Sequence, residues 1–383
     1  MVDQHMTIIG AGLGGLTLAS VLHRHGIDAT VYDLEASPTV RHQGSILDMH
    51  EESGQLALRK AGLFETFRQM VIPSGDDMRI LDKTGTVRWE DSGDDTRPEI
   101  DRGALREILL QSLPATCIQW GSKVTGVVPL DGARYEVRLA NGETFTTALV
   151  IGADGAWSKV RPLLSNAQPL YSGISFVETY LFDADARHPE SAALVGHGSM
   201  FALSDEKGLI THRDGDGRIT VYIALKTDEQ WMSSGGINFR DTEAAKRQLL
   251  ASFPDWDDRL RALIAESDAE LIPRGIYALP VGHRWKRIPG VTLLGDAAHL
   301  MSPFAGEGAN LAMRDGTELA EALLAHQNDV ETALASYEAV LFPRSKATAV
   351  ESATNLADSF RSDAPRGMVD QMARYTSQGT HGS

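Results

Sequence analysis

A glycine-rich turn near the N-terminus has the spacing of a dinucleotide-binding loop. Gly10, Gly12 and Gly15 form a GxGxxG pattern after a short apolar run and before residues with helical spacing. The first glycine permits a tight turn, the second lets the backbone approach a pyrophosphate, and the third allows close helix packing. The N–H groups at the start of the helix would face the phosphates. Asp33 follows near the roughly 20-residue separation at which an acidic side chain reaches a ribose hydroxyl.

Two further motifs combine an acidic residue with a turn. Gly295–His299, with Asp296, ends an apolar run and is followed by the glycine-rich segment Pro303–Asn310. Asp296 could accept hydrogen bonds from a chain of hydroxyls, and a helix dipole after the turn would stabilise an electron-rich ring. The same residues could equally form a tight connection between strand and helix. In mid-chain, Asp154-Gly155 fits either a ligand site or an ordinary type I turn.

The elements that would position these motifs alternate between strand and helix. Residues 6–10, 13–25 and 27–33 have the pattern of strand, helix and strand, a βαβ unit with parallel strands. Apolar runs at 148–154 and 291–296 predict two more strands of the same layer. The fold class is therefore α/β, and its nucleotide-binding layer is discontinuous in sequence. Arg102 to Arg106 fall on a predicted helix, as surface cations or as ligand contacts.

The remaining segments have a different texture. Residues 135–139 and 143–150 predict a hairpin around Asn141-Gly142, a typical turn dipeptide. Residues 170–275 predict a sheet-rich domain for substrate. Helical spacing occurs at 242–252, 255–266, 310–326 and 330–360, and residues 376–383 are expected to form a frayed tail.

Composition excludes several classes of function. Lys and Arg number 36 against 52 Asp and Glu, a net charge of −16, which disfavours nucleic acid and anionic membrane surfaces. One cysteine, Cys117, cannot form an internal disulfide, and no zinc-ligand spacing occurs, so a reducing cytoplasm is expected and no metal. No apolar stretch reaches the roughly 20 residues of a membrane span. Without a heptad seam, a monomer is expected.

The order and separation of the motifs resemble class A FAD-dependent aromatic hydroxylases related to para-hydroxybenzoate hydroxylase. Further segments are similar to the Tet(X)-type tetracycline-inactivating monooxygenases, namely Arg41–His50, Ser53–Gln55, Lys60–Leu63, Pro98–Arg102, Leu105–Leu113 and Asp296–Met301. The resemblance implies a Rossmann-like GR2-type FAD-binding domain, a β-sheet substrate domain and a long C-terminal helix. The expected FAD-binding domain has a first part at 1–170, with an inserted sheet segment 70–100, and a second part at 276–325. The expected substrate-binding domain is 171–275, and the C-terminal helix and tail are 326–383.

The resemblance also implies residue roles. Gly12 and Gly15 would line the FAD pyrophosphate, Asp33 would hold the adenosine ribose although it is shorter than the usual Glu, and Arg41 matches an arginine assigned to NADPH. Glu307 replaces a common Gln near the flavin. The expected cofactor-binding residues are Gly10, Gly12, Gly15, Asp33, Arg41, Asp48, Arg102, Asp154, Asp296, Gly308 and Asn310, with Pro303, Gly306 and Glu307 beside the flavin ring.

The substrate side departs from the tetracycline-inactivating enzymes. Where those enzymes use a glutamine and an arginine, this chain has Glu178 and Met200. Met200 removes a cation and its fork of donors, and Glu178 offers only acceptors when ionised. Arg213 or His212 could supply the missing cation. The expected substrate-binding residues are Glu178, Met200 and Arg213.

The implied reaction needs electrons that no cysteine cluster, haem motif or metal site in the sequence supplies, so an organic cofactor must supply them. The resemblance implies that NADPH or NADH reduces FAD, and that a flavin hydroperoxide formed with O2 hydroxylates an aromatic or polyketide substrate, with a tetracycline as one candidate. No protein nucleophile is required. Two alternatives are a flavin-dependent reductase or dehydrogenase of similar fold, and a non-catalytic protein that binds flavin or drug.

Overall fold

The computed structural model describes residues 6–40, 46–72, 77–93, 96–234 and 236–379. Two compact units share the chain. The first comprises Met1–Val71, Ile100–Leu170 and Ala278–Ser352, and the second comprises Ile72–Glu99, Tyr171–Tyr277 and Ala353–Ser383. Each unit is thus assembled from three separate stretches of sequence.

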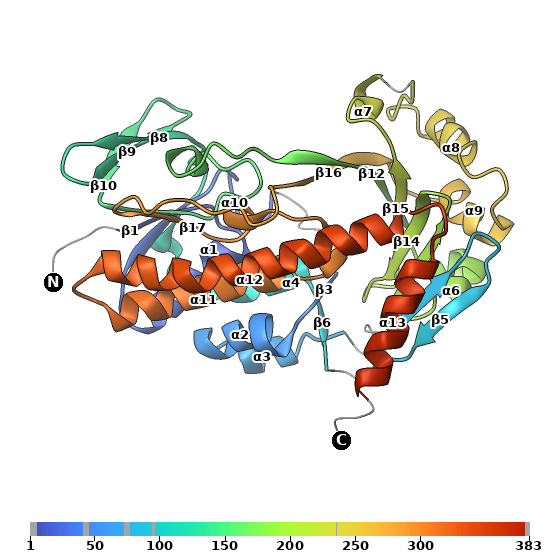
Figure 1. Ribbon diagram of the computed structural model, residues 1–383, viewed down its shortest axis with the longest axis horizontal. Helices are drawn as coiled ribbons and strands as arrows, with labels where there is room; N and C mark the ends of the chain where they lie inside the picture. The colour runs from blue at the N-terminus through green and yellow to red at the C-terminus, as the bar shows by residue number, and fades with distance from the viewer. Residues whose placement is uncertain (1–5, 41–45, 73–76, 94–95, 235, 380–383) are drawn as a thin grey trace. The chain divides into compact units, whose positions relative to one another are not determined.

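A parallel sheet forms the centre of the first unit (Figure 1). Its strand order is β17-β11-β1-β2-β7, with bounds Val291–Leu293, Leu149–Gly152, Met6–Ile9, Ala29–Tyr32 and Ile118–Gln119. β1 and β2 pair in parallel, with Met6 opposite Ala29 and Ile9 opposite Tyr32. The predicted βαβ unit is therefore confirmed.

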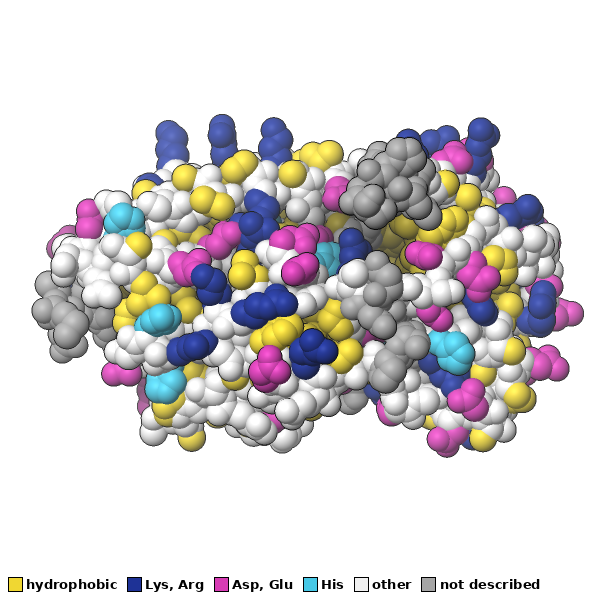
Figure 2. Space-filling model, turned by 90° about the horizontal axis from the view of Figure 1, so that it is seen from below, with side chains coloured by type: hydrophobic (Ala, Val, Ile, Leu, Met, Phe, Trp, Pro, Cys, Tyr) yellow, Lys and Arg dark blue, Asp and Glu magenta, His cyan; other side chains and the backbone are white. Residues whose placement is uncertain are grey.

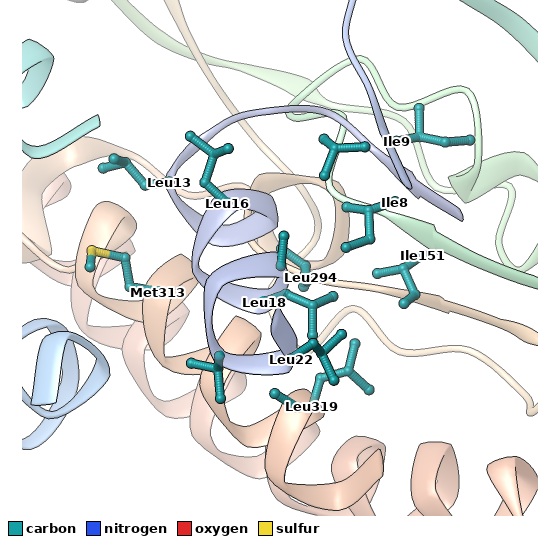
Figure 3. Close-up of a cluster of buried hydrophobic side chains, with 14 of the residues drawn as sticks. Ile8, Ile9, Leu13, Leu16, Leu18, Leu22, Ile151, Leu294, Met313 and Leu319 are labelled. Atoms are coloured by element: carbon teal, nitrogen blue, oxygen red, sulfur yellow. The ribbon is translucent and has the colours of Figure 1, made fainter. Parts of the chain in front are cut away.

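The helices of this unit pack through apolar and small residues. Their bounds are α1 (Leu13–Arg24), α2 (Leu56–Ala61), α3 (Phe64–Arg68), α4 (Arg102–Gln111), α10 (Asp296–His299) and α11 (Gly308–Ala325), with the first part of α12 (Val330–Ser359). In Figure 3, Leu18 and Leu22 of α1 lie between strand residues such as Ile8 and Leu319 of α11. A Cβ on Gly316 would lie 2.5 Å from the carbonyl oxygen of Gly14, so glycine permits the close approach of α1 and α11.

A small antiparallel sheet belongs to the same unit. It consists of β8 (Val124–Leu130), β9 (Arg134–Leu139) and β10 (Thr144–Thr147). β9 and β10 pair around Asn141 and Gly142, and Gly142 has φ +89°, a conformation that favours glycine. This confirms the predicted hairpin. Two short strands, β3 (Ile46–Asp48) and β6 (Glu99–Asp101), pair separately.

A seven-stranded sheet forms the second unit. Its order is β16-β12-β15-β14-β13-β4-β5, with bounds Ile272–Ala278, Leu170–Leu181, Ile219–Lys226, Lys207–Arg213, Ser199–Ser204, Met78–Leu81 and Val87–Asp91. The helices are α5 (Ala184–Arg187), α6 (Pro189–Val195), α7 (Trp231–Ser234), α8 (Thr242–Leu250), α9 (Asp258–Ala265) and α13 (Arg366–Gly379). Alternate strand residues such as Val177 and Val221 pack with Leu249 and Leu263 of the helices in one core.

Two segments differ from the sequence-based expectation. Residues 70–100, expected as an insert of the first domain, supply β4 and β5 to the seven-stranded sheet, where β4 pairs in parallel with β13. The expected frayed end is helical up to Gly379, and Met368 of α13 packs with Ile80 and Leu203. Both differences come from contacts distant in sequence.

One face of the described surface carries charges of both signs. On the face drawn in Figure 2, basic and acidic side chains are interspersed rather than separated. Of the helices that the structure describes, none is long and apolar enough to cross a membrane.

Candidate cofactor site

Three motifs that are far apart in sequence meet at one edge of the parallel sheet. β11 pairs in parallel with both β1 and β17, so the carboxyl ends of the three strands lie side by side. The turn after β1 touches the turn after β11, because a Cβ on Gly10 would lie 2.3 Å from the carbonyl oxygen of Ala153. Open parallel sheets bind ligands at this edge. The glycine turn, Asp154 and Asp296 therefore share one candidate site.

The glycines of the first turn fall into two kinds. Gly10 has φ +109°, and a Cβ on Gly15 would lie 2.2 Å from the carbonyl oxygen of Gly10, so the fold itself requires both. Gly12 is exposed and has φ −78°, and a Cβ there would meet no described atom within 4 Å. Gly308, the first residue of α11, has the same freedom. At both helix starts the space beside the glycine is open, as a bound pyrophosphate or ring would need.

Asp33 and Asp154 use their carboxylates differently. Asp33 accepts hydrogen bonds from the backbone N–H groups of Ala11 (2.6 Å) and Glu35 (2.8 Å), and so fastens the end of β2 to the glycine turn. Oδ2 of Asp154 accepts from Lys159 N (2.6 Å), but its buried Oδ1 has no partner among the described residues. Burial raises the pKa of Asp154. Because an orphaned buried acceptor is costly, Asp154 Oδ1 suits a hydroxyl donor.

A buried network holds the backbone around Asp296. Gly295 N donates to Asp315 Oδ2 (2.8 Å), which also lies 2.6 Å from His299 Nε2. Arg344 Nη2 donates to the other oxygen of Asp315 (2.7 Å). Burial lowers the pKa of His299, but Asp315 outweighs this and raises it. His299 therefore serves as a structural partner of Asp315.

Asp296 itself is not used by this network. Its side chain is exposed, yet enough protein surrounds it that desolvation raises its pKa. The charges of His299, of Arg102 at the start of α4 and of Arg161 lower the pKa of Asp296, but burial outweighs them. Asp296 thus presents an acceptor in a setting of low dielectric, as a hydroxyl chain would require.

Two side chains form hydrogen bonds with backbone carbonyl groups of α10. Arg161 Nη1 donates to Ala297 O (3.1 Å), and His283 Nδ1 lies 2.6 Å from Ala298 O. Burial lowers the pKa of His283, so the neutral ring donates from Nδ1 and accepts from the Ser165 hydroxyl at Nε2 (2.9 Å). Local sequence patterns do not predict these two hydrogen bonds, because both join residues more than ten positions apart.

The segment 303–310 closes against the end of β3. Gly306 has φ +68°, and a Cβ there would lie 3.7 Å from Asp48 Oδ2. Asn310 Nδ2 donates to Asp48 O (2.8 Å) and Asn310 Oδ1 accepts from His50 N (3.1 Å). Between them, His50 Nε2 lies 2.8 Å from Asp48 Oδ2, and His50 Nδ1 lies 2.8 Å from Glu307 Oε1. The structure therefore brings together Asp48, Gly306, Glu307 and Asn310, as predicted for one site.

His50, Glu52 and Glu307 also place potential metal ligands within 4.8 Å of one another. Both ring nitrogens of His50 already lie at hydrogen-bond distance from carboxylate oxygens. A protonated imidazole accounts for this geometry without a metal ion.

Arg106 is a supporting residue, for which the sequence left open a surface position or a ligand contact. It is 3% exposed, and it donates to Ala11 O (3.2 Å), Pro38 O (2.8 Å) and Glu35 Oε2 (3.0 Å). It therefore fixes the carbonyl of the glycine turn. The one sequence signal was its place beside Leu105 on the apolar face of α4. Arg41, predicted to contact NADPH, lies outside the described residues.

The predicted substrate residues lie in the second unit and do not share a face. Glu178 on β12 is buried, accepts from Tyr180 Oη and pairs with Arg274 Nε (2.5 Å). Met200 is fully buried in the core with the helices, on the opposite face of the sheet. Arg213 pairs with Asp185. Side chains alternate between the two faces along a strand. Ser199 and Phe201, which flank Met200 in the sequence, therefore lie on the same face of the sheet as Glu178.

His212, the other candidate cation, is also held in place. It lies 2.9 Å from Glu99 Oε2 and 3.4 Å from Asp214 Oδ1. Burial lowers its pKa, but the hydrogen bonds and charges of Asp214 and Glu99 outweigh this and raise the pKa to about 9. His212 is thus an internal cation of the second unit.

Comparison with known proteins identifies the family of this chain. Residues 3–352 match the family described as FAD binding domain. Monooxygenase AsqM of Emericella nidulans is 31% identical over 422 residues, which cover 90% of this chain and 93% of that protein. The structure of Klebsiella pneumoniae HpxO complexed with FAD and uric acid has a TM-score of 0.77 at 22% identity, covering 98% of this chain and 93% of that chain. Tetracycline destructase Tet(51) has a TM-score of 0.71 at 19% identity, covering 99% and 96%.

The chain therefore belongs to the FAD binding domain family. It is an FAD-dependent monooxygenase, a flavoprotein of a family in which NAD(P)H is the usual reductant. The predicted fold class, enzyme class and cofactor are confirmed. The likeness to HpxO and Tet(51) concerns the fold.

Proposed function

We propose that this monooxygenase hydroxylates an electron-rich aromatic or enolic carbon of a small aromatic or polyketide molecule. The observation that carries the proposal is the pair of glycines, Gly12 and Gly308, at the starts of α1 and α11. Neither glycine is required by its own surroundings, and the space beside each is open. Open space at these two helix starts is what the pyrophosphate and the ring system of FAD would need.

The roles of the site residues follow from this fit. The N–H groups after Gly12 would bind the pyrophosphate, and Asp33 would accept from the ribose, since each of its oxygens keeps a lone pair. Asp154 and Asp296 would accept from further hydroxyls. The start of α11, with Pro303, Gly306 and Gly308, would lie against the flavin ring, where the helix dipole stabilises negative charge. When bound, FAD supplies the transfer of electrons from NAD(P)H and the reaction with O2.

A tetracycline is the substrate we put forward first. The support is the set of segments similar to the Tet(X)-type enzymes, together with the shared fold of Tet(51). On the substrate side, Glu178 with Tyr180 and Arg274 would replace the glutamine and arginine of those enzymes, and Arg213 would stay paired with Asp185. Met200 would take no part in substrate binding, since its side chain is fully buried.

Gly12→Ala should fold normally and bind FAD poorly. A methyl group at position 12 meets no described atom, so we expect the free energy of unfolding to stay within about 0.5 kcal/mol. Overpacking against the pyrophosphate costs about 1–3 kcal/mol, so the Kd for FAD should rise roughly tenfold or more. Flavin fluorescence titration measures the Kd, and urea unfolding measures the stability.

Gly126→Ala is the matched control, because a Cβ on Gly126 of β8 also meets nothing within 4 Å and lies outside the site. It should keep the wild-type Kd. Equal FAD affinity in the Gly12 and Gly126 variants would contradict the proposed position of the pyrophosphate at this turn.

The substrate is tested by NADPH oxidation with mass spectrometry of the products. The purified enzyme is offered tetracycline, anhydrotetracycline and simple phenols. A tetracycline product heavier by one oxygen atom supports the proposal in full, and turnover of phenols alone moves the substrate to another aromatic compound. NADPH oxidation without an oxygenated product would favour a reductase, and no oxidation with any ligand would favour a binding protein.

A further inference from the structure

An imidazole is held between two carboxylates that are far apart in the sequence. His50 is 4% exposed, and its two ring nitrogens each lie 2.8 Å from one carboxylate oxygen, of Asp48 on one side and of Glu307 on the other. Asp48 ends β3, and Glu307 immediately precedes α11. The ring therefore connects two segments of the candidate cofactor site.

The geometry needs one more proton than a neutral imidazole carries. A neutral ring has a single N–H, so one nitrogen would present its lone pair to a carboxylate oxygen at 2.8 Å. With both nitrogens protonated, each contact becomes a charge-assisted hydrogen bond. Such bonds are about twice as strong as neutral ones, and the cation separates two like charges.

We propose that protonated His50 is a positioning residue, which holds Glu307 against Asp48 and so fixes the start of α11 for FAD. This inference rests on the proposed position of FAD at that helix start. Asn310 adds two neutral hydrogen bonds across the same junction, to Asp48 O and from His50 N. Glu307 Oε2 is buried without a hydrogen-bond partner among the described residues, so the held carboxylate offers one acceptor to a ligand.

The acidic groups around the His50 ring favour its protonated form. Asp48 from β3, Glu52 from the helical turn Glu51–Gln55 and Glu307 before α11 are the acidic groups that surround it. Burial lowers the pKa of His50, but the hydrogen bonds and charges of Asp48 and Glu307 outweigh this and raise it to about 9. Because the folded pKa lies above the ordinary 6.5, the stabilisation is complete below about pH 6.5 and is lost as the pH rises through about 9.

FAD affinity should therefore have an alkaline step that depends on His50. For the wild-type protein we expect a constant Kd between pH 6.5 and 8 and weaker binding as the pH passes 9. A glutamine side chain carries no charge and cannot donate to both carboxylates from two sides as the protonated ring does. His50→Gln should therefore bind FAD about tenfold more weakly or worse at pH 7.5 and lack the step. Glu307→Gln removes one of the two groups that hold the proton, so its step should move to lower pH. Fluorescence titration of FAD at each pH gives these profiles.

His23→Gln is the matched control, since His23 is exposed on α1 and has no part in the site. Its profile should equal that of the wild type, and titration of the flavin itself is common to all variants. A second readout needs no FAD: NMR of the histidine Cε1–H groups, in which the signal lost in His50→Gln should titrate near pH 9.

The results separate this inference from the proposed function. If His50→Gln keeps the wild-type Kd and pH profile, or if the His50 signal titrates near 6.5, the positioning role is overturned, even though FAD binds. If the His50 signal titrates near pH 9 and no variant binds FAD, the protonated bridge stands and FAD binding at this site fails. A shifted step in Glu307→Gln together with a lost step in His50→Gln establishes the bridge.

Discussion

Asp296→Ala should weaken FAD binding about 5- to 150-fold and leave the fold intact, because a hydrogen-bond partner in such a setting contributes about 1–3 kcal/mol. The side chain of Asp296 is exposed, while the neighbouring backbone is held by Asp315, Arg161 and His283 rather than by Asp296. Surrounding protein desolvates the carboxylate and raises its pKa. The measurements are the flavin absorbance of the purified variant and a titration with FAD.

Two further variants make this result specific. Asp296→Asn keeps an acceptor and should fall between the wild type and Asp296→Ala. Asp131→Ala removes an exposed acid in the turn after β8 and should keep the wild-type Kd. Full FAD occupancy of Asp296→Ala would contradict the placement of the cofactor at the end of β17.

Arg344→Met should destabilise the first unit by about 3–5 kcal/mol, the usual cost of leaving a buried charge without its partner. Asp315 is fully buried and Arg344 is its cationic partner from α12, which lies beside α11 in Figure 1. Arg344 also pairs with Glu318. Without Arg344, the Asp315 carboxylate keeps two of the partners described above, the His299 ring and the N–H group of Gly295. Chemical denaturation followed by circular dichroism measures the loss.

A control variant and a compensating variant test whether the unpaired Asp315 charge causes the loss of stability. Arg134→Met replaces an exposed arginine of β9 and should change the stability by less than about 0.5 kcal/mol. Adding Asp315→Asn to Arg344→Met removes the buried charge and should recover part of the loss. A loss below about 1 kcal/mol in Arg344→Met would show that the network is not what holds α10 and Asp296 in place.

The parts of the fold that the sequence predicts are those with local causes. The glycine turn between β1 and α1, the Asn141-Gly142 hairpin and the helices at 242–252 and 310–326 follow from turn chemistry and periodicity over a few residues. Helix α13 and the pairing of β4 with β13 were missed because they depend on partners over a hundred residues away.

The candidate site shows the same division. Motif spacing selected Asp154, Asp296 and the turn at 303–310, and the parallel register brings the first two to one edge. The contacts of His50, Arg106 and Asp315 could not be predicted, since each joins segments from different parts of the chain. Met200 was assigned to the substrate by matching positions alone. A shift of one residue along a strand moves a side chain to the opposite face, and the structure places Met200 in the core.

The most direct test of the central claim is isotope labelling of the oxygen. The enzyme with FAD and NADPH is supplied with 18O2 in ordinary water, with the best substrate from the tetracycline and phenol panel, and the product is analysed by mass spectrometry. We expect one atom of 18O in the product, formed only when NADPH is present and lost in Gly12→Ala at limiting FAD. A product that takes its oxygen from water, or NADPH oxidation with no oxygen incorporated, would contradict the assignment as a monooxygenase.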